Sequence, residues 1–261
     1  MSREVPQLAV NVETRADKSE IILPGCIPGA TPYHHSVMEG HALTLEPGSF
    51  HHILLLIAGE VRFETDGNEY IFHERVSFVP SPAKSVTIHA LTDAQLLEIR
   101  WDWKEGDDEL AAEYKTHFPL IQIYRNAKQY RDRNKSDKTI SRVVIEQRKI
   151  PRFCCGSVET YGVDLVKPHD HPMLDQYFFS FPENDMFVLI DGEPIPMKGN
   201  ELLYIPLGAD HGVDIRLGQH CHYMWIDFYP DNDEALKRLD WSHKDTGVHR
   251  EFTEEQKKGL A

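Results

Sequence analysis

Short segments rich in β-branched and aromatic residues, separated by turns that contain Gly, Pro or Asp, run through most of the chain. Few stretches have the period of a long helix. Short strands at this spacing are typical of antiparallel sandwiches and barrels, so the sequence predicts a mainly all-β fold. The expected strands are His52–Leu56, Glu60–Glu64, Glu69–His73, Val76–Val79, Val86–His89, Leu96–Trp101, Ile140–Ile145, Tyr161–Val166, Gln176–Phe181, Met186–Ile190, Leu202–Ile205, Val213–Ile215 and Cys221–Tyr229.

A smaller part of the chain has helical periodicity. The expected helical segments are Asp107–Phe118, Arg125–Asn134, Asn232–Asp240 and a polar tail from Thr253 to Lys258. These segments lie between or after the strand-rich blocks, so we expect a partly helical linker and a helical C-terminus.

The two strand-rich blocks resemble each other. Asp66-Gly67 begins a strand in the first block and Asp191-Gly192 does so in the second. Each block later has an aliphatic residue followed by proline, at Val79 and at Ile205, and each ends in an aromatic strand. This repetition favours two copies of one β-barrel, and the alternative is one continuous β-sandwich with chance similarity between its turns.

The second block contains a pattern suited to metal binding. Its first part reads His169-Asp170-His171 with Gln176 following, and its second part reads Pro206-Leu207-Gly208-Ala209-Asp210-His211. On a strand, residues two apart share a face, so His169 and His171 are expected to point the same way. Together with His211 they could surround one divalent ion, with Gln176 as a fourth ligand or as a hydrogen-bonding neighbour of the ligands.

These residues resemble the two motifs of the cupin superfamily. The first family motif has a glycine, His-x-His and then a glutamate, and the second has a glycine and Pro-x-Gly-x-x-His. Here Gln176 stands where glutamate is usual, the glycine that ends the first motif is absent, and Ile215 occupies a position that is often Asn. The resemblance covers residues 160–228 well and 41–103 loosely, which is similar to a bicupin.

The resemblance implies two jelly-roll cupin β-barrels in tandem. We expect a degenerate N-terminal barrel at 1–103, a partly helical linker at 104–150, a metal-binding barrel at 151–230 and a helical tail at 231–261. The implied cofactor is one divalent transition metal (Fe, Mn, Zn or Ni), held by His169, His171, His211 and Gln176.

The first block lacks the equivalent ligands. When the repeats are aligned, Gly48, Phe50, Leu55 and Ser85 fall at the four ligand positions. The pairs His34-His35 and His51-His52, together with His89, could form a differently built site, but adjacent histidines point to opposite faces of a strand. The first barrel is therefore expected to serve packing, dimerisation or the cavity wall.

Other side chains are weaker candidates. Cys154-Cys155 is expected to be a buried structural pair, since no activating base is placed beside it. Catalytic residues are not identified by the sequence, and the candidates are Tyr161, Tyr204 and His222, because a tyrosine or a histidine of the C-terminal barrel could reach the metal cavity.

The charge balance restricts the partners. The formal net charge is −14, and an acidic surface repels nucleic acid and anionic lipid. No helix-turn-helix pattern, bilayer-spanning run or signal peptide is evident, and the four cysteines form no disulfide framework. We expect a cytoplasmic homodimer that binds a small molecule, with neither nucleic acid nor a membrane as partner.

Three functions fit these expectations. The first is a metal-dependent enzyme that acts on a small, anionic hydroxy- or keto-compound or a carbohydrate-like molecule by isomerase- or lyase-type Lewis-acid chemistry. The second is an Fe(II)-dependent dioxygenase, and the third is a non-catalytic small-molecule-binding cupin. The first is favoured, and the sequence does not identify the substrate.

Overall fold

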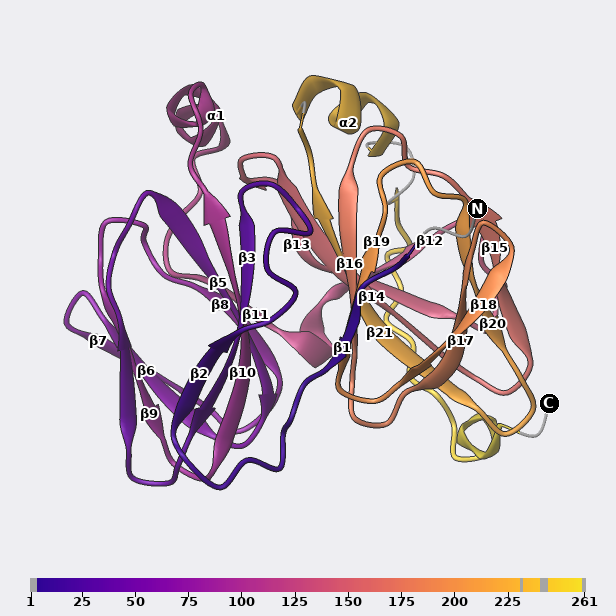
Figure 1. Cartoon of the computed structure of the whole chain (residues 1–261), viewed down its shortest axis with the longest axis horizontal. Coiled ribbons are helices and arrows are strands. Elements are labelled where there is room, and N and C mark those ends of the chain that lie inside the picture. The colour runs from indigo at the N-terminus through magenta and orange to yellow at the C-terminus, as the bar shows by residue number, and fades with distance from the viewer. Residues whose placement is uncertain (1–3, 231, 240–243, 260–261) are drawn as a thin grey trace. The chain divides into compact units, whose positions relative to one another are not determined.

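The computed structural model describes residues 4–230, 232–239 and 244–259 and divides the chain into two units. Residues 10–126 form one unit, and residues 127–261 together with the first nine residues form the other. Each unit consists of two antiparallel sheets, and the strands can be followed in Figure 1. The structure is all-β in class, as the sequence predicts.

The N-terminal unit has a six-stranded and a four-stranded sheet. The larger has the order β11-β8-β5-β10-β3-β2 and the smaller β4-β9-β6-β7. Their bounds are β2 Lys18–Ile21, β3 Ala30–Val37, β4 Ala42–Leu45, β5 Phe50–Ala58, β6 Val61–Thr65, β7 Asn68–Phe72, β8 Val76–Val79, β9 Val86–Ala90, β10 Ala94–Asp102 and β11 Leu120–Ile123. Side chains from both sheets, such as Leu54 and Phe63, form one buried core.

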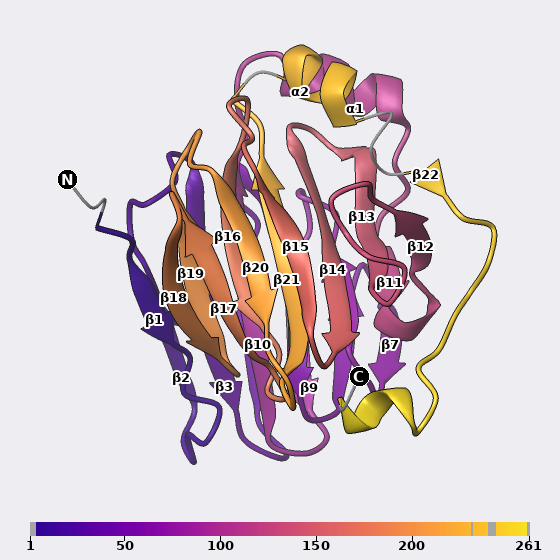
Figure 2. The ribbon, with the colours of Figure 1, turned by 90° about the vertical axis from the view of Figure 1, so that its right-hand side faces the viewer.

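The C-terminal unit is built the same way (Figure 2), with an eight-stranded sheet, β1-β19-β16-β21-β14-β13-β12-β22, and a four-stranded sheet, β15-β20-β17-β18. Their bounds are β1 Gln7–Ala9, β12 Lys128–Arg131, β13 Ile140–Ile150, β14 Phe153–Tyr161, β15 Asp164–His169, β16 Asp175–Ser180, β17 Asp185–Ile190, β18 Glu193–Lys198, β19 Glu201–Ile205, β20 His211–Ile215, β21 His220–Phe228 and β22 Lys244–Asp245. Phe178, Val188 and Trp225 belong to its core, which both sheets supply.

The described helices are few and short. They are α1 Asp107–Tyr114, α2 Asn232–Leu239 and two 3-10 turns, η1 Tyr124–Asn126 and η2 Gln256–Lys258. The helix expected over Arg125–Asn134 is wrong, because this segment contains η1 and then β12, which pairs with β13. Within the described residues, no helix combines the length and the apolar character needed to cross a membrane.

The boundaries of the units differ from those expected. The segment 104–150 is not a linker, because β11 pairs with β8 in one unit while β12 and β13 complete the large sheet of the other. Gln7–Ala9 pairs with β19 and so belongs to the C-terminal unit. The pairings of β11 with β8 and of β1 with β19 link strands far apart in sequence, which local periodicity does not encode. The expected helical tail contains α2, β22 and η2, and its residues 231, 240–243 and 260–261 lie outside the described part.

Candidate metal centre

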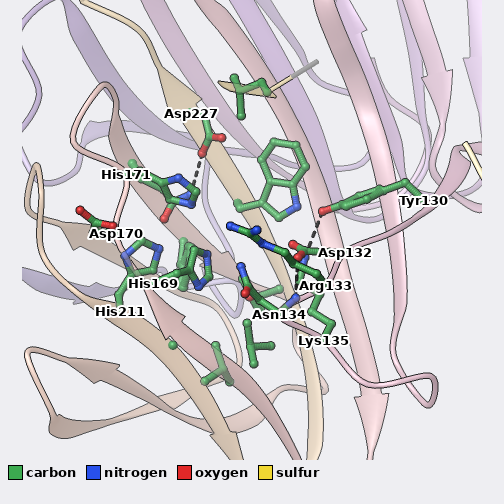
Figure 3. Close-up of a pocket in the computed structure, with 18 of the residues that line it drawn as sticks. Tyr130, Asp132, Arg133, Asn134, Lys135, His169, Asp170, His171, His211 and Asp227 are labelled. Atoms are coloured by element: carbon green, nitrogen blue, oxygen red, sulfur yellow. Dashed lines mark hydrogen bonds and ion pairs between the residues drawn. The ribbon is translucent and has the colours of Figure 1, made fainter. Parts of the chain in front are cut away.

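The three predicted histidines come together in the C-terminal unit (Figure 3). Their ring centroids are 4.8 Å apart for His169 and His171, 4.9 Å for His169 and His211, and 5.3 Å for His171 and His211. One ligand nitrogen of each ring lies within 4.8 Å of those of the other two. This separation allows all three to bind a single ion.

Two neighbouring strands position these rings. His169 ends β15 and is paired with His211, which begins β20, whereas His171 follows after β15 has ended. Gly212 permits the close approach, since a Cβ at this position would lie 2.6 Å from the carbonyl oxygen of Val166. His169 and His171 therefore do not share a strand face as expected, because His169 is the last residue of β15 and His171 lies in the turn that follows.

Backbone hydrogen bonds fix which nitrogen of each ring faces the cluster. His169 donates Nδ1–H to the carbonyl oxygen of Lys167 at 2.7 Å, and His211 donates Nδ1–H to that of Ala209 at 3.0 Å. A carbonyl can only accept, so Nε2 of each ring keeps its lone pair for a metal. Burial, with the nearby His169, lowers the pKa of His211 to about 4, so its imidazole is neutral at pH 7.

Gln176, on β16, has its amide oriented by a buried carboxylate. Its Nε2 donates to Oδ1 of Asp227 at 2.6 Å, while its Oε1 is buried and has no hydrogen-bond partner. Leaving a buried carbonyl oxygen unpaired costs about 1–3 kcal/mol. Gln176 and the three histidines line the same cavity, so a divalent metal bound there would have three imidazoles and this amide oxygen as potential ligands, and the residues present fit such an ion. Burial raises the pKa of Asp227 to about 7, although the bond from Gln176 opposes that rise.

The cluster lines a cavity of about 450 Å³. Figure 3 shows the histidines on one side, with residues from β12 and the β12–β13 turn on the other. That second wall holds a buried polar network, in which Lys135 Nζ lies 3.1 Å from Asp132 Oδ2 and donates to Tyr130 Oη at 3.1 Å. Arg131, Arg133 and Asn134 also line this cavity.

The residues of this second wall are not among the site residues predicted from the sequence. Tyr130-Arg-Asp-Arg-Asn-Lys135 is a dense run of charge in the segment interpreted as linker, and such runs are usually solvated. The one feature of the sequence that distinguishes this run from a purely charged loop is the tyrosine at its start.

The three proposed catalytic residues lie elsewhere. Tyr161, Tyr204 and His222 are not among the described residues that line the cavity. Tyr161 stacks on His220, Tyr204 donates to Asp175 Oδ1 at 3.3 Å, and His222 Nδ1 contacts Glu183 Oε1 at 2.6 Å. Strand alternation explains the correction, since Tyr161 and His222 lie on the sheet face opposite to Val158 and Tyr223 of the core.

The histidines of the N-terminal unit are engaged in a different arrangement. Buried Glu98 contacts His35 Nε2 at 2.6 Å and His52 Nδ1 at 2.5 Å. Burial alone would raise the pKa of Glu98, but the hydrogen bonds from these two histidines outweigh it and hold the pKa well below its usual range. His34 and His51 point away from this network, to Gln95 and to the ring of Trp103 respectively.

Similar folds occur among solved structures. A cupin 2 conserved barrel domain protein from Leptotrichia buccalis matches with a TM-score of 0.61 and 14% identity, over 87% of this chain and 98% of that chain. A putative glyoxylate-induced protein from Pseudomonas aeruginosa matches with a TM-score of 0.65 and 8% identity, over 91% and 84%.

A variant of Bacillus subtilis oxalate decarboxylase matches with a TM-score of 0.64 and 9% identity, over 100% of this chain and 87% of that chain. The chain has the cupin fold. No protein-family model and no curated protein sequence matches this chain, so the comparisons show the fold, and the chemistry must be inferred from the residues of the site.

Proposed function

We propose that this cupin is a metal-dependent enzyme that acts on a small anionic hydroxy- or keto-compound, or on a carbohydrate-like acid, by isomerase- or lyase-type chemistry. One observation carries the proposal. Three imidazoles gather on one side of a cavity of about 450 Å³ that Gln176, with its unpaired amide oxygen, also lines, and Arg133 and Lys135 line the other side.

The metal centre would use His169, His171, His211 and the Oε1 atom of Gln176. When bound, a divalent ion there supplies a Lewis acid that polarises a carbonyl or enolate oxygen. All four ligands are neutral, so the full charge of the ion is retained, which favours an anionic substrate. Three imidazoles with an open position also suit Fe(II), so the ligand set itself does not separate the dioxygenase alternative, and oxygen consumption does.

The opposite wall would bind and orient the substrate. The planar guanidinium of Arg133 suits a carboxylate, which it can hold through two parallel hydrogen bonds. Tyr130 is the group best placed to move a proton at its Oη, because Lys135 donates to that oxygen and burial raises the phenol's pKa, so that it remains protonated at neutral pH. Asp132 balances the buried charge of Lys135.

The proposal is tested with matched ligands. Protein reconstituted with Mn²⁺, Zn²⁺ or Fe²⁺ is titrated calorimetrically with small hydroxy- and keto-acids and with their methyl esters, and turnover is followed by NMR. We expect acids to bind at least about tenfold more tightly than esters, a difference of about 1.4 kcal/mol. Arg133→Gln should abolish this preference, whereas Arg216→Gln, at a half-exposed arginine paired with Asp214, should retain it.

Two outcomes would overturn the proposal. One is equal binding of acids and esters by the wild-type protein. The other is turnover that consumes oxygen in proportion to product, which would establish the dioxygenase alternative.

A further inference from the structure

A second group of metal-binding side chains lies on the other face of the eight-stranded sheet. Glu159 is on β14 and His220 and His222 are on β21. Their cross-strand register places Glu159 directly opposite His222, and Tyr161 opposite His220. Because Cys221 and Tyr223 alternate with the two histidines and belong to the core, this cluster is separate from the cavity of the first centre.

The distances within the cluster are those of ligands around an ion. His220 Nε2 lies 3.5 Å from Glu159 Oε1, and His222 Nε2 lies 3.9 Å from Glu159 Oε2. A charge-assisted hydrogen bond would bring such atoms to about 2.7–2.9 Å. Two ligands bound tetrahedrally at about 2.1 Å from one metal are separated by about 3.4 Å. The buried His220 Nε2 has no hydrogen-bond partner, and one ligand atom from each residue falls within a 4.8 Å set.

Neighbouring side chains hold both rings in orientation. Glu183 Oε1 lies 2.6 Å from Nδ1 of His222, which directs the Nε2 of that ring toward Glu159. A carboxylate on the remote nitrogen is the usual partner of a metal-binding histidine. The ring of Tyr161 is stacked on that of His220, with centroids 3.9 Å apart and an interplanar angle of 10°.

The charge of the cluster also suits a cation. Glu159 supplies the one carboxylate of the cluster, beside the imidazoles of His220 and His222. Arg142 Nη1 donates to Glu159 Oε2 at 2.9 Å. This bond involves Oε2, whereas Oε1 lies 3.5 Å from His220 Nε2 and accepts a long hydrogen bond of 3.5 Å from the hydroxyl of Tyr161.

We propose that Glu159, His220 and His222 form a second divalent-metal site, suited to Zn²⁺ or another first-row ion that accepts two imidazoles and one carboxylate, with Glu183 as the residue that orients His222. This site stands independently of the function proposed for the cavity, because the two clusters share no residue and lie on opposite faces of the sheet.

The test counts metal ions in the full-length chain. Protein stripped with a chelator is titrated calorimetrically with Zn²⁺, and the bound metal is measured after dialysis. We expect two equivalents for wild type, one for His222→Ala, one for His211→Ala and none for the double variant. Co²⁺ should give visible absorption of a tetrahedral site in His211→Ala, and His222→Ala should lack that contribution.

Matched variants separate metal binding from folding. His73→Ala removes a histidine that contacts Glu60 at 2.5 Å without a third ligand, and it should still bind two equivalents. Glu183→Gln should retain the stoichiometry but weaken this site about 10- to 100-fold. Arg142→Gln should tighten it, because a competing cation is removed; a purely structural ion pair would instead give a less stable protein with unchanged Zn²⁺ affinity.

The outcomes also distinguish the two proposals. A wild-type chain that binds one equivalent, lost in His211→Ala and retained in His222→Ala, overturns the second site and leaves the function proposed for the cavity intact. One equivalent lost only in His222→Ala would refute the metal centre of the cavity and support the second site.

Discussion

The orientation of one amide decides the character of the cavity site. Gln176 donates to Asp227, so its oxygen has no partner, in a cavity that the three histidines also line. A glutamate, the residue usual at this position of the family motif, would have no hydrogen to donate to that carboxylate. Gln176 and Asp227 therefore act as a matched pair, and each can be tested by reversing its hydrogen-bonding role.

Gln176→Glu should retain the metal of the cavity but destabilise the metal-free protein by about 2 kcal/mol, because two carboxyl groups then meet in a buried site. Differential scanning calorimetry with and without Zn²⁺ would show a larger metal-induced rise in Tm than in wild type. The double variant Gln176→Glu with Asp227→Asn exchanges donor and acceptor and should recover most of the stability; failure to recover would mean that the pair does not control the site.

Asp227→Ala should weaken metal binding at the cavity about 10- to 100-fold, as expected when a residue that orients a ligand is removed. Asp227→Asn keeps an oxygen that can accept from Gln176 Nε2, so its affinity should stay close to that of wild type. Calorimetric titration with Zn²⁺ measures both variants. Equal affinity in Asp227→Ala and wild type would remove Gln176 from the ligand set or show that it needs no support.

The turn between β12 and β13 is an ordered wall of the cavity because its charges are paired. The side chains of Lys135 and Asp132 are only 7% and 15% exposed, and their contact at 3.1 Å compensates for the desolvation of both. A solvated run of the same composition would form no fixed surface. The buried pair therefore converts a charged segment into a structural element.

Asp132→Asn should destabilise the protein by about 3 kcal/mol, since it leaves the Lys135 ammonium buried without a counter-charge. Urea unfolding measures the loss, and adding Lys135→Met should restore most of it. As a control, Glu254→Gln breaks an exposed ion pair with Lys257 and should leave stability essentially unchanged. A similar small effect for Asp132→Asn would contradict the role given to the turn.

Across the whole molecule, the two units use the same two-sheet construction around different interiors. In the N-terminal unit, Glu98 bonds directly to His35 and His52, and hydrogen bonds satisfy these groups. In the C-terminal unit, three imidazoles lie close together in a cavity that a buried, unpaired amide oxygen also lines. The polar groups of the first interior pair with one another, while the second has the donor atoms that the proposed metal would use.

The N-terminal network should make stability fall in acid. The folded-state pKa of Glu98 lies below its unfolded value of about 4.3, so its contribution is fully present above that pH and is lost as the pH falls below it. Urea unfolding between pH 7 and pH 3 should show this loss in wild type. Glu98→Gln should have lower stability at pH 7 and a shallower decline; parallel pH profiles would contradict the assignment.

The sequence by itself determined the all-β class, the repeated block and the histidines of the cavity. These features are local properties of the sequence. Strand alternation, turn residues and each of the two segments that contain His169, His171 and His211 can be recognised from a few consecutive residues. The same local reading placed Tyr161, Tyr204 and His222 near the metal, because it could not identify the sheet face that forms the cavity.

Only the tertiary structure decided the partner of each polar group. The bond between Gln176 and Asp227, the wall formed by Tyr130 and Lys135, and the placement of Gln7–Ala9 in the C-terminal unit depend on which strands become neighbours. Which strands pair depends on how two whole sheet faces are buried against each other. That burial involves many residues that are distant in sequence. The alternation along a strand determines which face of the sheet each side chain lies on. The long-range pairing of strands determines which side chains it contacts on that face.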